Sequence, residues 1–132
     1  MRERHVSCRV SIVEGTRRCA KCKTSVAVED FHKSARTFSG LQTRCKACGL
    51  AYAWCKQFRI SWEDAQKLLA KKTEGCFACS TSDDLHLDHD HQTGRIRGFL
   101  CGNCNRALGI LRDDPVRILR LREYLASPSP LQ

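Results

Sequence analysis

The sequence predicts a small α+β protein that is stabilised by two zinc ions. Ten of its 132 residues are cysteines, and eight of these form four C-x-x-C pairs. The pairs fall into two sets, with 22 and 21 residues between the pairs, and four thiolates at this spacing can close a tetrahedral zinc site. Short apolar runs with strand or helix periodicity lie beside the pairs. The predicted zinc ligands are Cys19, Cys22, Cys45 and Cys48 in the first set and Cys76, Cys79, Cys101 and Cys104 in the second.

Ten cysteines are also compatible with five disulfide bonds in a secreted protein. Zinc is favoured because the paired spacing is that of zinc knuckles and because no apolar signal segment follows Met1. No apolar run approaches the roughly 18 residues that a membrane span needs. We therefore expect a protein of the reducing cytoplasm without a membrane partner.

The net charge of +9 lies in the first half of the chain. Residues 1–60 carry 13 Lys and Arg against 4 Asp and Glu, whereas residues 61–132 carry 10 of each. A solvated basic surface is one interpretation, but basic residues on a zinc-held loop favour nucleic acid as the partner. The predicted DNA contacts in this half are Lys33, Arg36 and Arg44.

Four segments follow from this organisation. We expect a flexible N-terminus at 1–15, a basic four-cysteine zinc module that binds DNA at 16–56, a second zinc-containing module at 57–126 and a tail at 127–132. Phe31 and Phe38 are expected to form the small core of the first module, since so small a unit needs every apolar side chain that it has.

Helices are predicted around the boundary between the two modules. Residues 47–58 have the pattern of a linking helix. Ser61 is a good N-cap for a second helix, which has acidic residues in its first turn and which Gly75 ends.

The second module is predicted to contain a hairpin and two helices. We expect a strand or extended loop at 86–91, a turn at 92–94, a second strand at 95–100 and then a helix at 104–111. Asp113-Asp114-Pro115 is a helix start, with an acidic cap and a proline at the first helical position. The apolar face of that last helix, formed by Ile118, Leu121 and Leu125, is expected to close the core.

The residues between and just after the second cysteine pairs carry the candidate chemistry. Four cysteines complete the zinc, so the histidines, aspartates and asparagine there have no structural ligand role to fill. Oxygen ligands suit magnesium, and an unliganded histidine can accept a proton from water. The alternative is that some of the histidines are stray zinc ligands or buried polar groups. A structural zinc beside a second metal predicts a phosphodiester-cleaving nuclease, with Asp88, His89, His91 and Asn105 as the candidate site.

Several motifs in fixed order carry a closer resemblance. Cys76-x-x-Cys79 is followed by Leu85-His86-Leu87-Asp88-His89-Asp90-His91 and by Gly94-Arg95-Ile96-Arg97-Gly98-Phe99-Leu100-Cys101-x-x-Cys104-Asn105. This run resembles the phage recombination endonuclease VII family, whose nuclease core has the ββα-metal (HNH) arrangement. The resemblance is closest over residues 76–112, and the upstream zinc module and helix also look like members of that family.

The resemblance implies a role for each matching residue. Asp88 and Asn105 would bind one Mg²⁺ or Mn²⁺ ion, and His89 would be the general base that activates water. His91 resembles a family histidine that lies near the phosphate, and His86 is a weaker candidate. Arg95 and Arg97 are further candidates for DNA contacts, as clamps on flanking phosphates.

The implied activity is a magnesium-dependent DNA endonuclease with two structural zinc ions, which nicks or cuts double-stranded DNA, with branched DNA as a candidate substrate. A phage-encoded enzyme would act in the cytoplasm of its bacterial host. The alternative is a non-catalytic zinc-finger protein that binds DNA as a regulator, with a vestigial Asp-His run. The sequence leaves oligomeric state and DNA preference open.

One residue departs from the family pattern, and one pair of residues poses a geometric problem. Leu108 stands where the phage prototype has a catalytic glutamate, and Asp90 and Asp113 are the candidate substitutes. Asp88 and His89 would also point to opposite faces of a regular strand. Both reach one site only if the chain bends between them or if the phosphate bridges the two.

Overall fold

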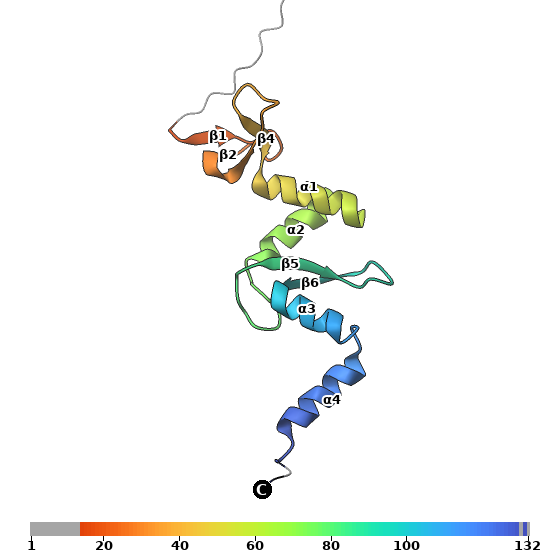
Figure 1. Ribbon diagram of the computed structural model, residues 1–132. Helices are drawn as coiled ribbons and strands as arrows, with labels where there is room; N and C mark the ends of the chain where they lie inside the picture. Colours follow the sequence, from red (N-terminus) through yellow and green to blue (C-terminus); the bar gives the residue numbers. More distant parts are fainter. Residues whose placement is uncertain (1–13, 130, 132) are drawn as a thin grey trace, which may run out of the picture. The chain divides into compact units, whose positions relative to one another are not determined.

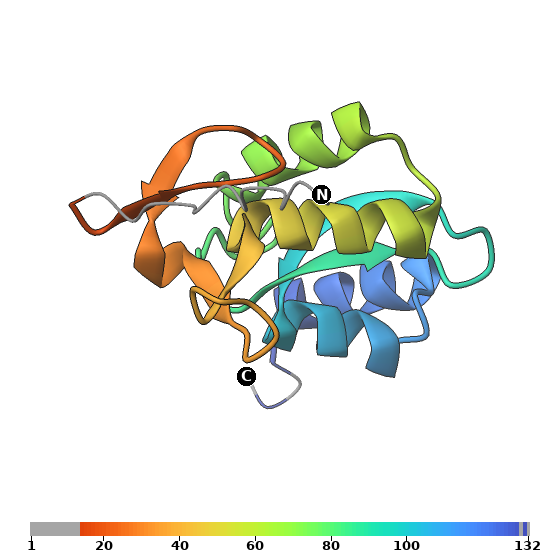
Figure 2. The ribbon, with the colours of Figure 1, turned by 90° about the horizontal axis from the view of Figure 1, so that it is seen from above.

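The computed structural model describes residues 14–129 and 131 (Figures 1 and 2). The chain divides into two compact units, Met1–Leu69 and Ala70–Gln132. The division falls inside the second long helix, later in the chain than the predicted module boundary at residue 56, and the predicted ranges stay a prediction. Most of the predicted flexible N-terminus lies outside the described residues, as does Cys8.

The first unit contains two small antiparallel sheets that precede its first long helix. Arg17 pairs with Val26 in one sheet, and Phe31 pairs with Cys45 in the other. The sequence predicted none of these strands, because most of them are too short for apolar alternation to show. The elements are β1 (Thr16–Arg18), β2 (Ser25–Ala27), a 3₁₀ turn (Val28–Asp30), β3 (Phe31–Lys33), β4 (Leu41–Cys45) and α1 (Lys46–Phe58).

The core of the first unit is built around its cysteines. Phe31 is buried together with Cys19, Cys45 and Cys48, and Val26, Leu41 and Trp62 pack against this cluster. The prediction for Phe31 is therefore confirmed. The prediction for Phe38 is wrong, because its side chain is fully exposed, at 104%. Phe38 lies in the turn between β3 and β4, where no neighbouring element covers it.

The two predicted helices of this region are confirmed. In α1, Ala51 and Trp54 are buried. The second helix is α2 (Trp62–Lys72), and the backbone N–H of Asp64 donates to the hydroxyl of Ser61 at 3.0 Å, as expected for an N-cap. Gly75 follows with φ +85°, a left-handed conformation that suits glycine, and it leads directly to Cys76.

A hairpin and a helix form the centre of the second unit (Figure 2). Strands β5 (Leu85–His89) and β6 (Ile96–Cys101) pair antiparallel, and α3 (Gly102–Ile110) follows at once. Cys76, Leu100 and Cys101 form the buried core, with Leu85, Cys104 and Leu108 packed against them. The predicted fold class, a small α+β protein with a hairpin–helix unit and two clusters of four cysteines, is confirmed.

The last helix, α4 (Pro115–Ala126), begins as predicted but does not close the core. The carboxylate of Asp114 accepts from the N–H groups of Val116 and Arg117, and Pro115 is the first helical residue. However, no residue of α4 is buried, and Leu125 is 82% exposed. The apolar face that was expected to pack inward is solvent-exposed, because β5, β6, α3 and the cysteines already complete the core. None of the described helices is long and apolar enough to cross a membrane.

Candidate functional site

The two cysteine sets have the geometry of zinc sites. Within each set the four sulfur atoms lie within 4.8 Å of one another. Tetrahedral zinc with Zn–S bonds of about 2.3 Å requires S–S distances of about 3.8 Å. The Sγ atoms of Cys79 and Cys101 are 3.7 Å apart. All nine cysteines within the described residues are free thiols, and the two clusters fit two structural zinc ions.

Backbone N–H groups lower the pKa of one thiol in each set, which favours the thiolate form that binds a cation. Burial acts to raise the pKa of Cys19, but N–H groups that include that of Cys45 outweigh it and lower the pKa to about 6. The N–H of Cys101 is the largest influence that lowers the pKa of Cys76 to about 6. In contrast, the neighbouring thiols raise the pKa of Cys104 to about 12. Four adjacent thiolates repel one another, so full ionisation needs a cation at the centre.

A β-bulge lies where the candidate site begins. Asp88 pairs with Gly98, but His89 pairs with Ile96, so Arg97 is an extra residue in β6. Gly98 takes φ +153°, which accommodates the irregular backbone. The extra residue bends β6 and increases its twist, but Asp88 and His89 stay consecutive in β5. The alternation expected for a strand therefore holds for these two side chains: Asp88 lines the cavity described next, and His89 does not.

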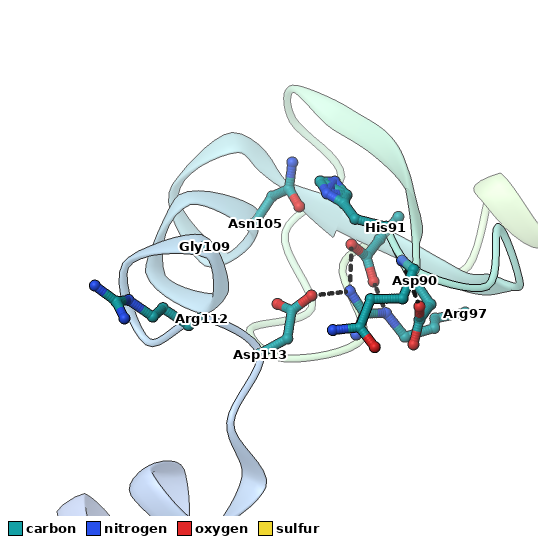
Figure 3. Close-up of a pocket in the computed structure, with 9 residues that line it drawn as sticks. Asp90, His91, Arg97, Asn105, Gly109, Arg112 and Asp113 are labelled. Carbon is teal, nitrogen blue, oxygen red and sulfur yellow. Dashed lines mark hydrogen bonds and ion pairs between the residues drawn. The ribbon is translucent and has the colours of Figure 1, made fainter.

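One polar cavity of about 560 Å³ lies beside the hairpin and α3 (Figure 3). Asp88 and His91 reach it from the hairpin, Asn105 from α3, and Asp113 from the corner after α3. Asp88 is almost buried, at 7% exposed. The structure therefore brings three of the four predicted catalytic residues to one place. The full lining is Asp88, Asp90, His91, Gln92, Arg97, Asn105, Gly109, Arg112 and Asp113.

Arg97 organises the acidic side of this cavity. Its Nε donates to Asp88 Oδ2 at 2.7 Å, and its Nη2 donates to Asp88 Oδ1 at 3.3 Å. The same Nη2 donates to Asp113 Oδ2 at 2.9 Å and to the carbonyl oxygen of His89 at 3.2 Å. The carboxylates of Asp88 and Asp113 raise the pKa of Arg97. The bidentate contact orients Asp88, and the contact with Asp113 ties the hairpin to the α3–α4 corner (Figure 3).

The two candidate substitutes for the missing glutamate differ in their contacts. Asp90 holds its own turn, because its Oδ1 accepts from the N–H groups of Gln92 at 2.9 Å and Thr93 at 2.8 Å. The N–H of Thr93, followed by that of Gln92, lowers the pKa of Asp90. The carboxylate of Asp113 instead faces Arg97 across the cavity. Leu108 packs in the core, and the next residue, Gly109, lines the cavity.

The histidines occupy three different environments. His91 lines the cavity, whereas His89 does not, although the centroids of their rings are only 4.8 Å apart. His86 lies outside the cavity, with its Nε2 3.0 Å from Asp84 Oδ1. The catalytic roles of His89 and His91 stay predictions.

The candidate DNA-binding residues are also separated. Lys33, Arg36 and Arg95 are exposed, and the guanidinium of Arg44 lies 4.1 Å from the ring centroid of Tyr52. The side chain of Arg97 is 28% exposed, with its donors turned to carboxylates. Their contacts with DNA stay predictions.

The sequence did not identify Gly109 or Arg112 as cavity residues. No local signal marks them, because only the α3–α4 corner brings them to the cavity.

Comparisons with known proteins agree with the resemblance seen in the motifs. Residues 51–127 match the family model of recombination endonuclease VII. The Gene 59 protein of Mycobacterium phage D29 is 30% identical over 105 residues, which cover 76% of this chain and 58% of that protein. The Gene 59 protein of Mycobacterium phage L5 is 40% identical over 62 residues, which cover 43% of this chain and 38% of that protein. The match thus spans somewhat more than half the length of the D29 protein and less than half that of the L5 protein.

One solved structure is similar in part. It is the beta-beta-alpha-Me type II restriction endonuclease Hpy99I, with a TM-score of 0.40 and 22% sequence identity over 85% of this chain and 65% of that one.

Proposed function

Because the chain belongs to the recombination endonuclease VII family, we propose that it is a metal-dependent endonuclease that cleaves phosphodiester bonds in DNA. The observation that carries the proposal is the convergence of Asp88, His91 and Asn105 on one polar cavity. A carboxylate, an imidazole and an amide oxygen are the groups that metal-assisted hydrolysis uses. Double-stranded DNA is the proposed substrate, and branched DNA is included.

The donors around the cavity fit a hard divalent cation. Asp88 and Asn105 would hold Mg²⁺ or Mn²⁺ through oxygen atoms, and Asp113 supplies the third oxygen donor in place of the missing glutamate. The contacts from Arg97 leave lone pairs on the oxygens of Asp88 and keep this carboxylate oriented, as partners of metal ligands commonly do. When bound, the ion would offset the negative charge that develops on the phosphate and on the leaving oxygen.

The histidines perform the proton transfers in this scheme. His89 accepts a proton from water, whose oxygen then forms a bond to phosphorus while the bond from phosphorus to the 3′ oxygen breaks. The products are a 5′ phosphate and a 3′ hydroxyl. His91, which faces the cavity, stabilises the phosphate or donates the proton that the 3′ oxygen takes up. The ring of His91 beside that of His89 supports a shared task for the two.

The basic first unit supplies the grip on DNA in this proposal. Between Asp30 and Glu63 the chain has no acidic residue and six basic ones. Such a segment attracts phosphates independently of base sequence and makes binding sensitive to salt. The phage relatives support a role in the cytoplasm of a bacterial host, where phage DNA is processed.

One observation favours the alternative of a DNA-binding protein without catalysis. Arg97 contacts both carboxylate oxygens of Asp88, the residue that a catalytic metal would need. A site that kept this ion pair closed would bind DNA and leave it intact.

Plasmid cleavage separates the two functions. Supercoiled plasmid is incubated with the zinc-loaded protein in Mg²⁺, in Mn²⁺ or in EDTA, and nicked and linear products are quantified. We expect cleavage in either metal and none in EDTA. His89→Ala should reduce the rate by about 10²- to 10⁴-fold, as for loss of a general base, with unchanged DNA affinity. His86→Ala is the matched control, because His86 contacts Asp84, whereas the ring of His89 lies beside that of His91, and this variant should cut like the parent protein.

Two results would contradict the proposal. Intact plasmid in both metals, together with tight DNA binding, would favour the non-catalytic protein. Parent-like cleavage by His89→Ala would reject the assigned base, and a selective loss in His91→Ala would transfer that role to His91.

A further inference from the structure

A phenylalanine projects from the turn between β3 and β4. Phe38 is 104% exposed, so no part of the described chain covers it. The turn itself is well ordered by hydrogen bonds: the N–H of Gly40 donates to Thr37 O at 3.0 Å, and the N–H of Ser34 donates to Gly40 O at 2.7 Å. The hydroxyl of Thr37 also donates to Leu41 O at 2.7 Å. The ring is therefore presented to solvent on a constrained support.

The surroundings of Phe38 are polar and basic. A single exposed apolar side chain needs no explanation by itself. Here, however, the residues next to Phe38 in the sequence are Arg36, Thr37 and Ser39, and the segment from Phe31 to Trp62 contains no acidic residue. This pattern lacks the contiguous apolar patch of a protein-docking surface. It is the combination of aromatic and cationic groups that binds unpaired nucleotides.

The same turn also lines a second cavity. It has a volume of about 400 Å³, and the turn contributes Ser34 and Thr37 to its lining. Strand β4 adds Arg44, and α1 adds Tyr52. The guanidinium of Arg44 lies 4.1 Å from the ring centroid of Tyr52, and the ammonium of Lys56 lies 5.4 Å from the same centroid. The hydroxyl of Ser34 and the guanidinium of Arg44 provide donors that fit the oxygens of a phosphate, whereas the proton of the Thr37 hydroxyl is already donated to Leu41 O.

We propose that the β3–β4 turn is a subsite for an unpaired nucleotide in DNA, with Phe38 stacked on the base and the Arg44 cavity holding a backbone phosphate of the same strand. The proposal rests on DNA as the substrate of the proposed function. It deepens that function by assigning a residue that distinguishes unpaired bases from intact duplex. Every base has an aromatic face, so the subsite tolerates any base sequence.

Binding is measured with the full-length, zinc-loaded protein in EDTA, so that no DNA is cut. Fluorescence anisotropy compares a labelled duplex with the same duplex containing one unpaired adenine. The parent protein should prefer the second DNA. Phe38→Ala should weaken binding to it by about 5- to 150-fold, the loss expected for one stacked base, and should change the affinity for the perfect duplex less than about twofold. Phe38→Trp, which keeps an aromatic face, should retain the preference.

Two further variants serve as controls. Phe77 is a comparably exposed phenylalanine, at 93%, in the second unit. Phe77→Ala should leave both affinities unchanged. Arg44→Ala should weaken binding to both DNAs and reduce the salt dependence by about one phosphate contact, since it removes charge rather than stacking.

The outcomes distinguish this subsite from the proposed activity. Equal losses on both DNAs in Phe38→Ala, or none on either, would overturn the subsite even if the parent protein cuts plasmid. A selective loss on the unpaired DNA would support the subsite even if the parent protein cuts nothing. Phe38-dependent binding to vesicles of phosphatidylserine and phosphatidylcholine, with unchanged DNA affinities, would assign the ring to a lipid surface and also overturn it.

Discussion

Adjacent residues of α3 should respond in opposite ways to the same new carboxylate. The resemblance to the phage prototype suggests a glutamate at position 108, but Leu108 packs against the core formed by Cys76, Leu100 and Cys101. Gly109 instead lines the cavity, and a Cβ atom at this position would have nothing within 4 Å. We therefore predict that Leu108→Glu destabilises the second unit and that Gly109→Glu supplies the cavity with an additional oxygen donor.

The structure sets the expected magnitudes. Leu108→Glu loses about 1 kcal/mol of apolar burial from a half-buried leucine and places a carboxylate among apolar neighbours at a further cost of about 1–3 kcal/mol. For a unit of this size, a total of about 2–4 kcal/mol lowers the melting temperature by about 10–20 °C. Gly109→Glu should raise it by a few degrees, because glycine in a helix costs about 0.5–1 kcal/mol.

The assay combines stability with metal dependence. Thermal unfolding of the zinc-loaded variants is followed by circular dichroism, and plasmid nicking is titrated with Mg²⁺ and Mn²⁺. Gly109→Glu should reach half-maximal cleavage at a lower metal concentration than the parent protein, and Gly109→Gln, the neutral control of equal size, should not. A Leu108→Glu variant as stable as the parent protein would refute the placement of the two residues, as would equal metal shifts in Gly109→Glu and Gly109→Gln.

Three further predictions test other parts of the structure. Cys101→Ser should lower the zinc content from two ions to one and unfold the second unit, which elemental analysis and circular dichroism would detect; two retained zinc ions would contradict the ligand set. Arg97→Leu leaves a buried carboxylate unpaired and should cost about 2–4 kcal/mol in urea unfolding, whereas Asp113→Ala should cost no more than about 1 kcal/mol; equal costs would show that the bidentate contact is not the stronger one. Lys33→Ala combined with Arg36→Ala should reduce the slope of log affinity against log salt by about 2 in anisotropy titrations, and an unchanged slope would exclude both residues from phosphate contact.

The sequence alone was sufficient wherever a local pattern imposes geometry. C-x-x-C spacing identifies the two cysteine clusters, because tetrahedral coordination of one ion requires the four sulfur atoms to converge. Ser61 and the Asp114-Pro115 pair identify helix starts, because the first N–H groups of a helix need acceptors. These signals act over a few residues and do not depend on the rest of the fold.

Patterns that depend on packing were less informative. Phe31 and Phe38 look alike in the sequence, yet only Phe31 meets the cysteine core, because Phe38 lies at the tip of a turn. The apolar face of α4 has the spacing of a core helix but finds no core to cover. Hydrophobic periodicity shows that an element has an apolar face, and the location of a partner surface decides whether that face is buried.

In the candidate site, too, some features follow from the local sequence and others only from the tertiary structure. The motif by itself indicated that Asp88, His89, His91 and Asn105 belong together, and the structure brings all of them except His89 to the cavity. Only the tertiary structure revealed the ion pairs of Arg97 and the arrival of Asp113 from the next corner. The ion pairs of Arg97 depend on the one-residue bulge in β6, because a shift of one residue exchanges the faces of a strand. The position of Asp113 depends on the path of the chain beyond α3, and no local sequence pattern encodes that path.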